Sequence, residues 1–216
     1  MAELDAVGRR IEQSAPHVVG LSVTLLDQGR AFTLAASDQQ VALLDVLQYL
    51  AGGPCVRAAR QQAEVSMNRA GMHQEGWHLL ASGMAGTGVA STLSIPLTVP
   101  VAGGAAVTGG VNLYGGSRGA FDGRHEELTR TCLEWAGDAV AAVGLDDLRA
   151  RTSSSGDELP DPRRHAVAMD QALAYLADVL AVSVDEARAR LHSAAARGGV
   201  QPGPVAELVA GLLQRR

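Results

Sequence analysis

The sequence contains no lysine, so all 18 of the residues counted as lysine or arginine are arginines. This absence excludes chemistry that needs a lysine amine, such as a P-loop phosphate site or a Schiff base. Cysteine is nearly absent too, because only Cys55 and Cys132 occur. Two cysteines at this separation make neither a disulfide framework nor a metal motif, and no catalytic triad or carboxylate pair is evident. We therefore predict a protein that is not an enzyme and that holds no metal or cofactor.

Aromatic residues make up only 3% of the chain. A pocket that stacks on a cyclic nucleotide or a haem needs aromatic rings, so neither ligand is expected. The sequence also lacks an apolar run of about 18 residues, and residues 1–14 lack the apolar centre of a secretory signal. We expect a cytoplasmic protein with no membrane partner.

What the sequence does contain is a globular balance of 47% hydrophobic and 19% charged residues. The formal net charge is −5, but it is unevenly distributed. Residues 159–216 contain seven arginines and six acids, whereas the preceding residues contain eleven arginines and seventeen acids. With a linker rich in serine and proline over residues 151–162, this pattern predicts an acidic domain, 1–150, and a slightly basic one, 163–216.

Apolar side chains at helical spacing predict three short helices in the C-terminal domain. The first spans Arg163–Leu180. The second begins at the N-cap Ser183, which forms a capping box with Glu186, and it ends at a pair of glycines. The third begins near Pro202 or Pro204. Helices of this length must pack on one another or on a partner chain.

One set of residues runs through the three predicted helices with the spacing of a known family. It comprises Met169, Gln171, Ala172, Leu176, Val182, Ser183, Asp185, Glu186, Ala187, Leu191, Ala195, Val205 and Ala206. The pattern resembles the ANTAR domain, the RNA-binding output module of bacterial antitermination regulators. Four positions depart from the family pattern, where polar or basic residues are usual: Leu173, Ala174, His192 and Ser193. The resemblance implies a three-helix bundle that binds a structured RNA hairpin.

The basic residues of this domain are the candidate RNA-binding residues, because arginine forms bidentate hydrogen bonds with phosphate. They are Arg163, Arg164, Arg188, Arg190, His192 and Arg197. The alternative is that these side chains form a solvated surface. The domain would then be degenerate and would act through protein–protein contacts or dimerisation.

The N-terminal domain alternates predicted helices and strands in an order that favours an α+β fold, an antiparallel sheet with helices at its sides. The helices are expected at residues 2–13, 38–50, 54–61, 71–84 and 122–149, and the strands at 18–26, 30–35, 90–99 and 105–114. Several short motifs recur in an order typical of one family: Leu47, Gly53-Pro54-Cys55, Ala58, Ser94-Ile95-Pro96-Leu97, Gly110-Val111-Asn112-Leu113-Tyr114 and Phe121-Asp122. They resemble the GAF domain, a small-ligand sensor fold.

A GAF domain followed by an ANTAR domain is a recurring arrangement in actinobacterial regulators. The two resemblances together imply a transcription antitermination regulator, in which a sensor is coupled to an RNA-hairpin-binding domain. An unknown small ligand is then expected between the sheet and its side helices, in a pocket lined by Trp77, Leu80, Met84, Leu93 and Leu113. The alternative is a core filled by side chains, with no ligand.

Two further features allow a functional and a structural interpretation. Cys55 follows a proline at a predicted helix start, where the helix dipole can lower a thiol pKa. It is either the reactive thiol of a GAF-fold thiol reductase or, as we expect, a buried core residue. The predicted helix 122–149 carries an apolar stripe wider than the sheet alone needs, so we expect this helix to form a homodimer.

Overall fold

The computed structural model describes residues 17–100, 106–142 and 165–214, and for Pro100 and residues 137–142 it describes the backbone alone. It has an α+β fold, as predicted, built on a five-stranded antiparallel sheet in the order β2-β1-β5-β4-β3. The strands are β1 (Val18–Asp27), β2 (Arg30–Ala36), β3 (Val65–Asn68), β4 (Ser91–Pro100) and β5 (Ala106–Gly115).

The two faces of the sheet differ because neighbouring residues of a strand point to opposite sides. On β4, Leu93 and Ile95 pack into an apolar core beneath α6 (His125–Ala142), together with Leu113 of β5. The residues between them on β4 and β5 are largely polar and face the other side. Ser94 is paired with Asn112, and Asn112 is in turn paired with Ser22 of β1. The sheet therefore has an apolar face and a polar face.

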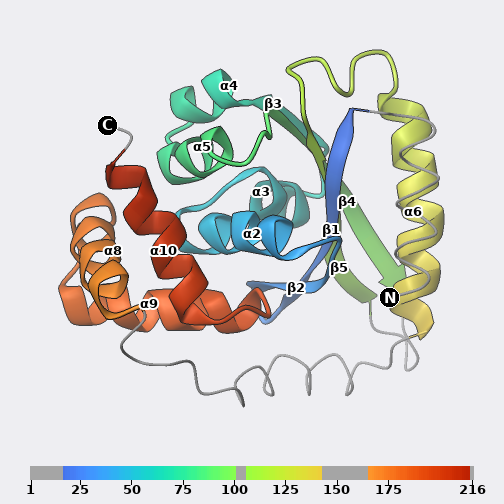
Figure 1. The fold of residues 1–216 in the computed structure, drawn as a ribbon. Coiled ribbons are helices and arrows are strands. Elements are labelled where there is room, and N and C mark those ends of the chain that lie inside the picture. The colour runs from blue at the N-terminus through green and yellow to red at the C-terminus, as the bar shows by residue number, and fades with distance from the viewer. Residues whose placement is uncertain (1–16, 101–105, 143–164, 215–216) are drawn as a thin grey trace.

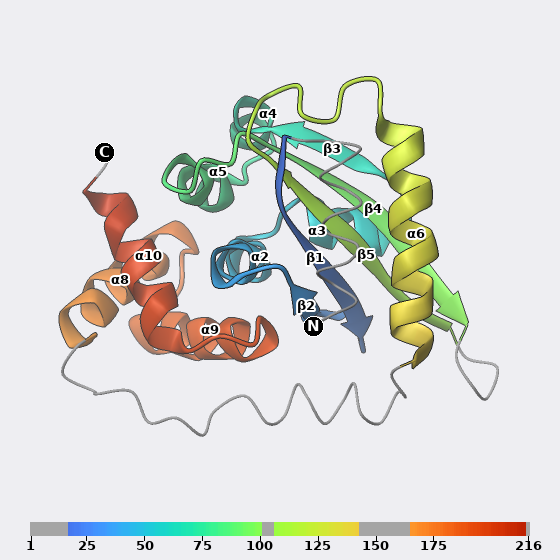
Figure 2. The same ribbon diagram turned by 45° about the vertical axis from the view of Figure 1, so that its right-hand side comes forward.

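Four helices cover the polar face, on the opposite side of the sheet from α6 (Figures 1 and 2). They are α2 (Gln39–Ala51), α3 (Pro54–Gln61), α4 (Arg69–Gln74) and α5 (His78–Ala85). Asp38 is the N-cap of α2, and its carboxylate accepts a hydrogen bond from the N–H of Val41 at 2.9 Å. Asn68 caps α4 in the same way, through the N–H of Gly71.

The structure differs from the prediction in two helices and in one additional strand. The helix expected at 71–84 is two helices, α4 and α5, separated at Gly76, which has a φ of +80°. The strand β3 was not predicted at all, and α6 begins at His125 rather than at Asp122. The helix predicted at 2–13, the far end of the helix at 122–149 and the linker 151–162 lie outside the described residues.

The C-terminal helices form a bundle of α8 (Ala166–Val179), α9 (Val184–Arg197) and α10 (Pro202–Leu213). Ser183 is the N-cap of α9, as predicted, and accepts from the N–H of Glu186 at 3.2 Å. In a full capping box the carboxylate of Glu186 would accept from the backbone N–H of Ser183. Here it accepts from Nε of Arg190 at 2.7 Å, one turn further along α9. Nδ1 of His165 lies 2.8 Å from Oε1 of Glu207, and this contact joins α8 to α10. The bundle core consists of Ala172, Leu173, Leu176, Ala187, Leu191, Ala194, Ala195, Val205, Ala206 and Val209.

The bundle packs against the outer side of α2, so that α2 lies between the sheet and the bundle (Figures 1 and 2). Leu44 and Leu47 of α2 belong to the same core cluster as Leu191 of α9. A Cβ added at Gly198, the C-cap of α9, would lie 2.2 Å from Cγ2 of Val46, so the two helices touch closely there. A single core thus joins the sheet domain to the bundle.

Within the described residues, none of the helices alone has the length and apolarity to cross a membrane. The pair α8 and α9, which meet at a bend of 105°, satisfies the length and composition requirement when taken together.

Candidate functional site

A buried polar cluster lies between the sheet and α2, with Asp45 at its centre. The carboxylate of Asp45 accepts hydrogen bonds from the hydroxyl of Tyr114 at 2.5 Å and from that of Thr33 at 3.0 Å. The Asp45 side chain is fully enclosed, and burial raises its pKa from 3.8 to about 6, against the opposing effect of the hydrogen bonds. Gln48, one turn along α2, donates to the Tyr114 hydroxyl at 3.1 Å.

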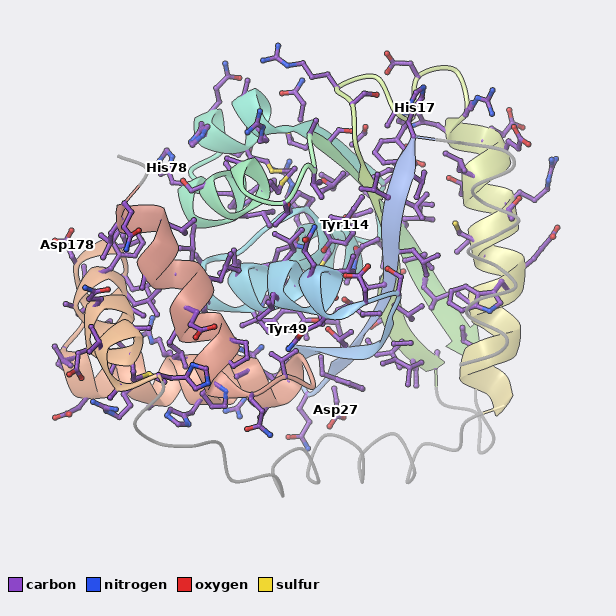
Figure 3. The ribbon with its side chains drawn as sticks, in the orientation of Figure 1. His17, Asp27, Tyr49, His78, Tyr114 and Asp178 are labelled. Carbon is purple, nitrogen blue, oxygen red and sulfur yellow. The ribbon has the colours of Figure 1, made fainter. Side chains whose placement is uncertain are left out.

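The cluster continues through Tyr49 to the strands. The Tyr49 hydroxyl lies 2.7 Å from Oγ1 of Thr33 and 3.1 Å from Oγ1 of Thr24. Asn112 donates from Nδ2 to Thr24 at 3.1 Å and to Ser22 at 3.0 Å. Tyr49 and Tyr114 come from the helix and the sheet respectively, so the cluster ties the two layers together (Figure 3).

Three atoms on the polar face of the sheet are buried without a hydrogen-bond partner among the described residues: Oγ1 of Thr92, Oγ of Ser94 and Oδ1 of Asn112. Strand pairing places Ser94 directly opposite Asn112. Buried polar atoms are almost always satisfied, so adjacent unsatisfied ones are suited to an ordered water or to a small polar ligand. This part of the cluster is the best candidate for a ligand site.

The structure does not bring together the five residues predicted to line a ligand pocket. Leu80 and Met84, with Trp77 at their edge, belong to the core around α2 and α5. Leu93 and Leu113 lie on the opposite face of the sheet, beneath α6. The prediction chose apolar residues of β4 and β5. Strand alternation instead places their polar neighbours on the side that the helices cover.

Cys55 is fully buried, and burial together with the nearby Asp45 raises its thiol pKa well above its ordinary value. Its Sγ lies 3.8 Å from Oγ1 of Thr24, and its N–H donates to Gln48 at 2.9 Å. Cys132 is a residue of α6 and is buried between that helix and the other face of the sheet. The structure therefore holds Cys55 as a core residue rather than an activated thiol, and it keeps the two cysteines apart.

Arg197, a predicted RNA-binding residue, is not free at the surface. Its Nη1 donates to the carbonyl of Ala31 at 3.1 Å and its Nη2 to the carbonyl of Tyr49 at 3.3 Å. The guanidinium carbon lies 5.1 Å from the centre of the Tyr49 ring. Sequence reasoning missed this role because α9 meets α2 and β2 only in the tertiary structure.

The other predicted basic residues of α9 are exposed, but they do not form one surface. Arg188 and His192 are four residues apart and lie on one flank of α9. Arg190 lies on the other flank, the side that carries Arg197, and its guanidinium is paired with Glu186. The predicted residues Arg163 and Arg164 lie outside the described residues.

At the junction of the bundle with α4 and α5 there is an open hollow of about 350 Å³. Arg69, His73 and Arg118 contribute its basic lining, and Leu212 of α10 forms the bundle side. Near the hollow, Nδ1 of His73 lies 3.1 Å from Nδ1 of His78. No group of three or more potential metal ligands occurs among the described residues. The junction is thus tightly packed where α9 meets α2 and open where α10 meets α4 and α5.

Comparison with known proteins leaves the family open, because no family model and no curated protein matches the chain. Among solved structures, the chain has a likeness to "SdiA in complex with octanoyl-rac-glycerol". The two share 12% sequence identity, the match covers 97% of this chain and 88% of that one, and the TM-score is 0.42. At that TM-score the likeness transfers neither a fold family nor a function to this chain.

Proposed function

We propose that this chain is a transcription antitermination regulator. In this proposal residues 1–150 are a GAF-like sensor, and residues 163–216 are an ANTAR-like bundle that binds a structured RNA hairpin. The observation that carries the proposal is the division of α9 into a buried side and an exposed side, which carries basic residues together with Asp185 and Glu186. Ala187, Leu191 and Ala194 are buried in the bundle, whereas Arg188 and His192 remain exposed. A helix held rigidly on one side can present its cations to a phosphate backbone on the other.

The sensing role rests on the buried polar cluster. Asn112, Ser94 and Thr92 present unsatisfied polar atoms inside the domain, on the side of the sheet that faces α2. A small polar ligand that hydrogen-bonded to these atoms would recover the free energy that their burial costs. This cluster replaces the apolar pocket predicted from the sequence.

A hairpin-binding experiment tests the RNA proposal. Purified full-length protein is used to select from a library of short RNA stem-loops, and the affinity of a selected hairpin is measured across a salt series. Because each neutralised phosphate adds to the salt dependence, Arg188→Ala should weaken binding and reduce the log–log salt slope by about 1. Arg130→Ala removes the same charge from α6, on the far side of the sheet, and should change neither quantity.

A second candidate is a bundle that acts through protein contacts without RNA. Two observations favour it: Leu173, at a position where the family pattern is basic, is only 1% exposed, and Arg197 is engaged by the sensor. Because Leu173 belongs to the bundle core, a lysine there would bury a charge, so the exposed Ser193 is the better position at which to restore a basic residue. If wild type selects no hairpin at low salt but Ser193→Arg does, the protein-contact function is favoured.

A further inference from the structure

Arg197 joins three elements through one side chain. It belongs to the last turn of α9, and its guanidinium bonds to the carbonyls of Ala31 in β2 and Tyr49 in α2. The planar fork of an arginine suits two acceptors at fixed positions, which a lysine ammonium cannot satisfy in the same way. The contact therefore fixes where the end of α9 sits on the sheet domain.

No carboxylate of the described residues neutralises the charge of Arg197 in this position. No described carboxylate lies within ion-pair distance of its guanidinium, whose described partners are carbonyl oxygens and an aromatic ring. Burial of the guanidinium lowers the pKa of Arg197, and the positive charges of the nearby Arg30 and Arg60 lower it further. Tyr49 acts in the opposite direction. A partly buried cation without a counter-charge gains more from a phosphate than from these partners. The contact is thus one with which an anion can compete.

Tyr49 touches Arg197 on one side and the polar cluster on the other. Its ring and carbonyl contact the guanidinium, while its hydroxyl bonds to Thr33 and Thr24. Thr24 is bonded in turn to Asn112, whose Oδ1 is one of the unsatisfied atoms. A continuous chain of contacts therefore leads from the candidate ligand site to the bundle.

We infer that the contact of Arg197 with Tyr49 and Ala31 is an autoinhibitory latch, which holds α9 on the sensor and withholds part of its basic surface from RNA. This inference rests on the proposed RNA-binding function. Arg190 and Arg197 are seven residues apart, two turns of α9, and lie on the same flank about 10 Å from each other. With the latch closed, Arg197 is occupied and the contact of that flank with α2 and β2 blocks an RNA backbone. When α9 is released from α2, the flank that carries Arg190 and Arg197 becomes accessible to RNA, in addition to the flank that carries Arg188.

A reversible cross-link tests the latch. Val46 and Gly198 face each other closely, because a Cβ at Gly198 would lie 2.2 Å from Cγ2 of Val46, so the pair Val46→Cys with Gly198→Cys is chosen to form a disulfide between α2 and α9. The native Cys55 and Cys132 are buried and do not compete. The oxidised double variant is locked in the docked state, and its affinity for a selected hairpin should be about tenfold or more below that of the same protein after reduction.

Each outcome of the cross-link experiment has a separate meaning. Failure of the disulfide to form would show that α9 does not dock on α2, and equal affinity in the oxidised and reduced states would overturn the latch while leaving RNA binding intact. Absence of hairpin binding in wild type and in the reduced variant alike would refute the RNA-binding function itself. Single-cysteine Val46→Cys treated with the same oxidant is the control and should show no change.

Two conservative variants separate the latch from the RNA contact. Arg197→Lys keeps the positive charge but loses the fork, so the hydrogen exchange of α9 amides should speed up and the RNA affinity should rise several-fold. Tyr49→Phe keeps the ring and carbonyl but removes the hydroxyl that reaches Thr33 and Thr24. Tyr49→Phe should therefore also speed up the hydrogen exchange of α9 amides and raise the affinity for RNA. If Arg197→Lys binds RNA no better than wild type although α9 exchanges faster, docking does not inhibit binding.

Discussion

Asp45 is the residue whose ionisation the fold opposes most clearly. Its pKa is raised from 3.8 to about 6 by burial, so between these values the folded protein holds a proton that the unfolded chain has released. The free energy of unfolding must therefore fall as pH rises through this window, by roughly 3 kcal/mol, and stay level above it. The polar cluster at pH 7 thus encloses a charge that destabilises the fold.

Asp45→Asn should abolish this part of the pH dependence. The amide keeps a carbonyl oxygen for Tyr114 and an N–H₂ for Thr33, but it does not ionise. Urea unfolding at several pH values between 4 and 7 should show a smaller decline for the variant than for wild type. Asp178→Asn, which changes an exposed carboxylate of α8, should follow wild type, and a variant at Asp45 that did so too would contradict the raised pKa.

At the scale of elements, the contact of α9 with α2 depends on the absence of a side chain at Gly198. The φ of Gly198 is −82°, which any residue adopts, so the requirement for glycine there is space and not conformation. Gly198→Ala would overlap Cγ2 of Val46 and should destabilise the protein by about 1–3 kcal/mol. Val46→Ala in the same chain should recover much of that loss, which a double-mutant cycle by urea unfolding measures.

A matched substitution checks that the effect of Gly198→Ala comes from the junction. Gly211 is also within a helix, α10, but a Cβ there meets nothing within 4 Å. Gly211→Ala should be neutral or slightly stabilising, since alanine has the higher helix propensity. Equal losses at the two glycines would point to the backbone rather than to packing against Val46.

The elements that the sequence predicted are those with local signals. Asp38 and Ser183 cap their helices through bonds three residues away, which a sequence pattern contains. Strand β3 has only four residues and pairs with β4 alone, so its existence depends on a partner far along the chain. The burial of Arg197 likewise depends on where α9 docks. The prediction of the pocket residues failed for a different reason. Side chains alternate along β4 and β5, and this pattern could have indicated that Ser94 and Asn112, rather than Leu93 and Leu113, face the helices α2 to α5.

For the whole molecule, the expected homodimer remains a prediction. Leu128, Cys132 and Ala136 of α6 are buried against the sheet, whereas Leu133 and Trp135 are only partly covered. Both side chains pack against the core beneath α6, and we expect their uncovered parts to be where a second copy packs. Light scattering at micromolar concentration should give twice the mass of the chain, and Leu133→Glu should return it to the monomer value. A single-chain mass for wild type would remove the dimer from the proposal.

The place of α2 between the sheet and the bundle also bears on how the protein is made. Synthesis proceeds from the N-terminus, so the ribosome completes the sheet and α2 well before it completes α8, α9 and α10. During that interval the outer side of α2, with Val46 at its centre, has no neighbour and is an apolar strip in contact with water. A nascent chain is therefore most prone to aggregation just before its last helices emerge, and a truncation that removes them should cost solubility as well as the proposed RNA binding.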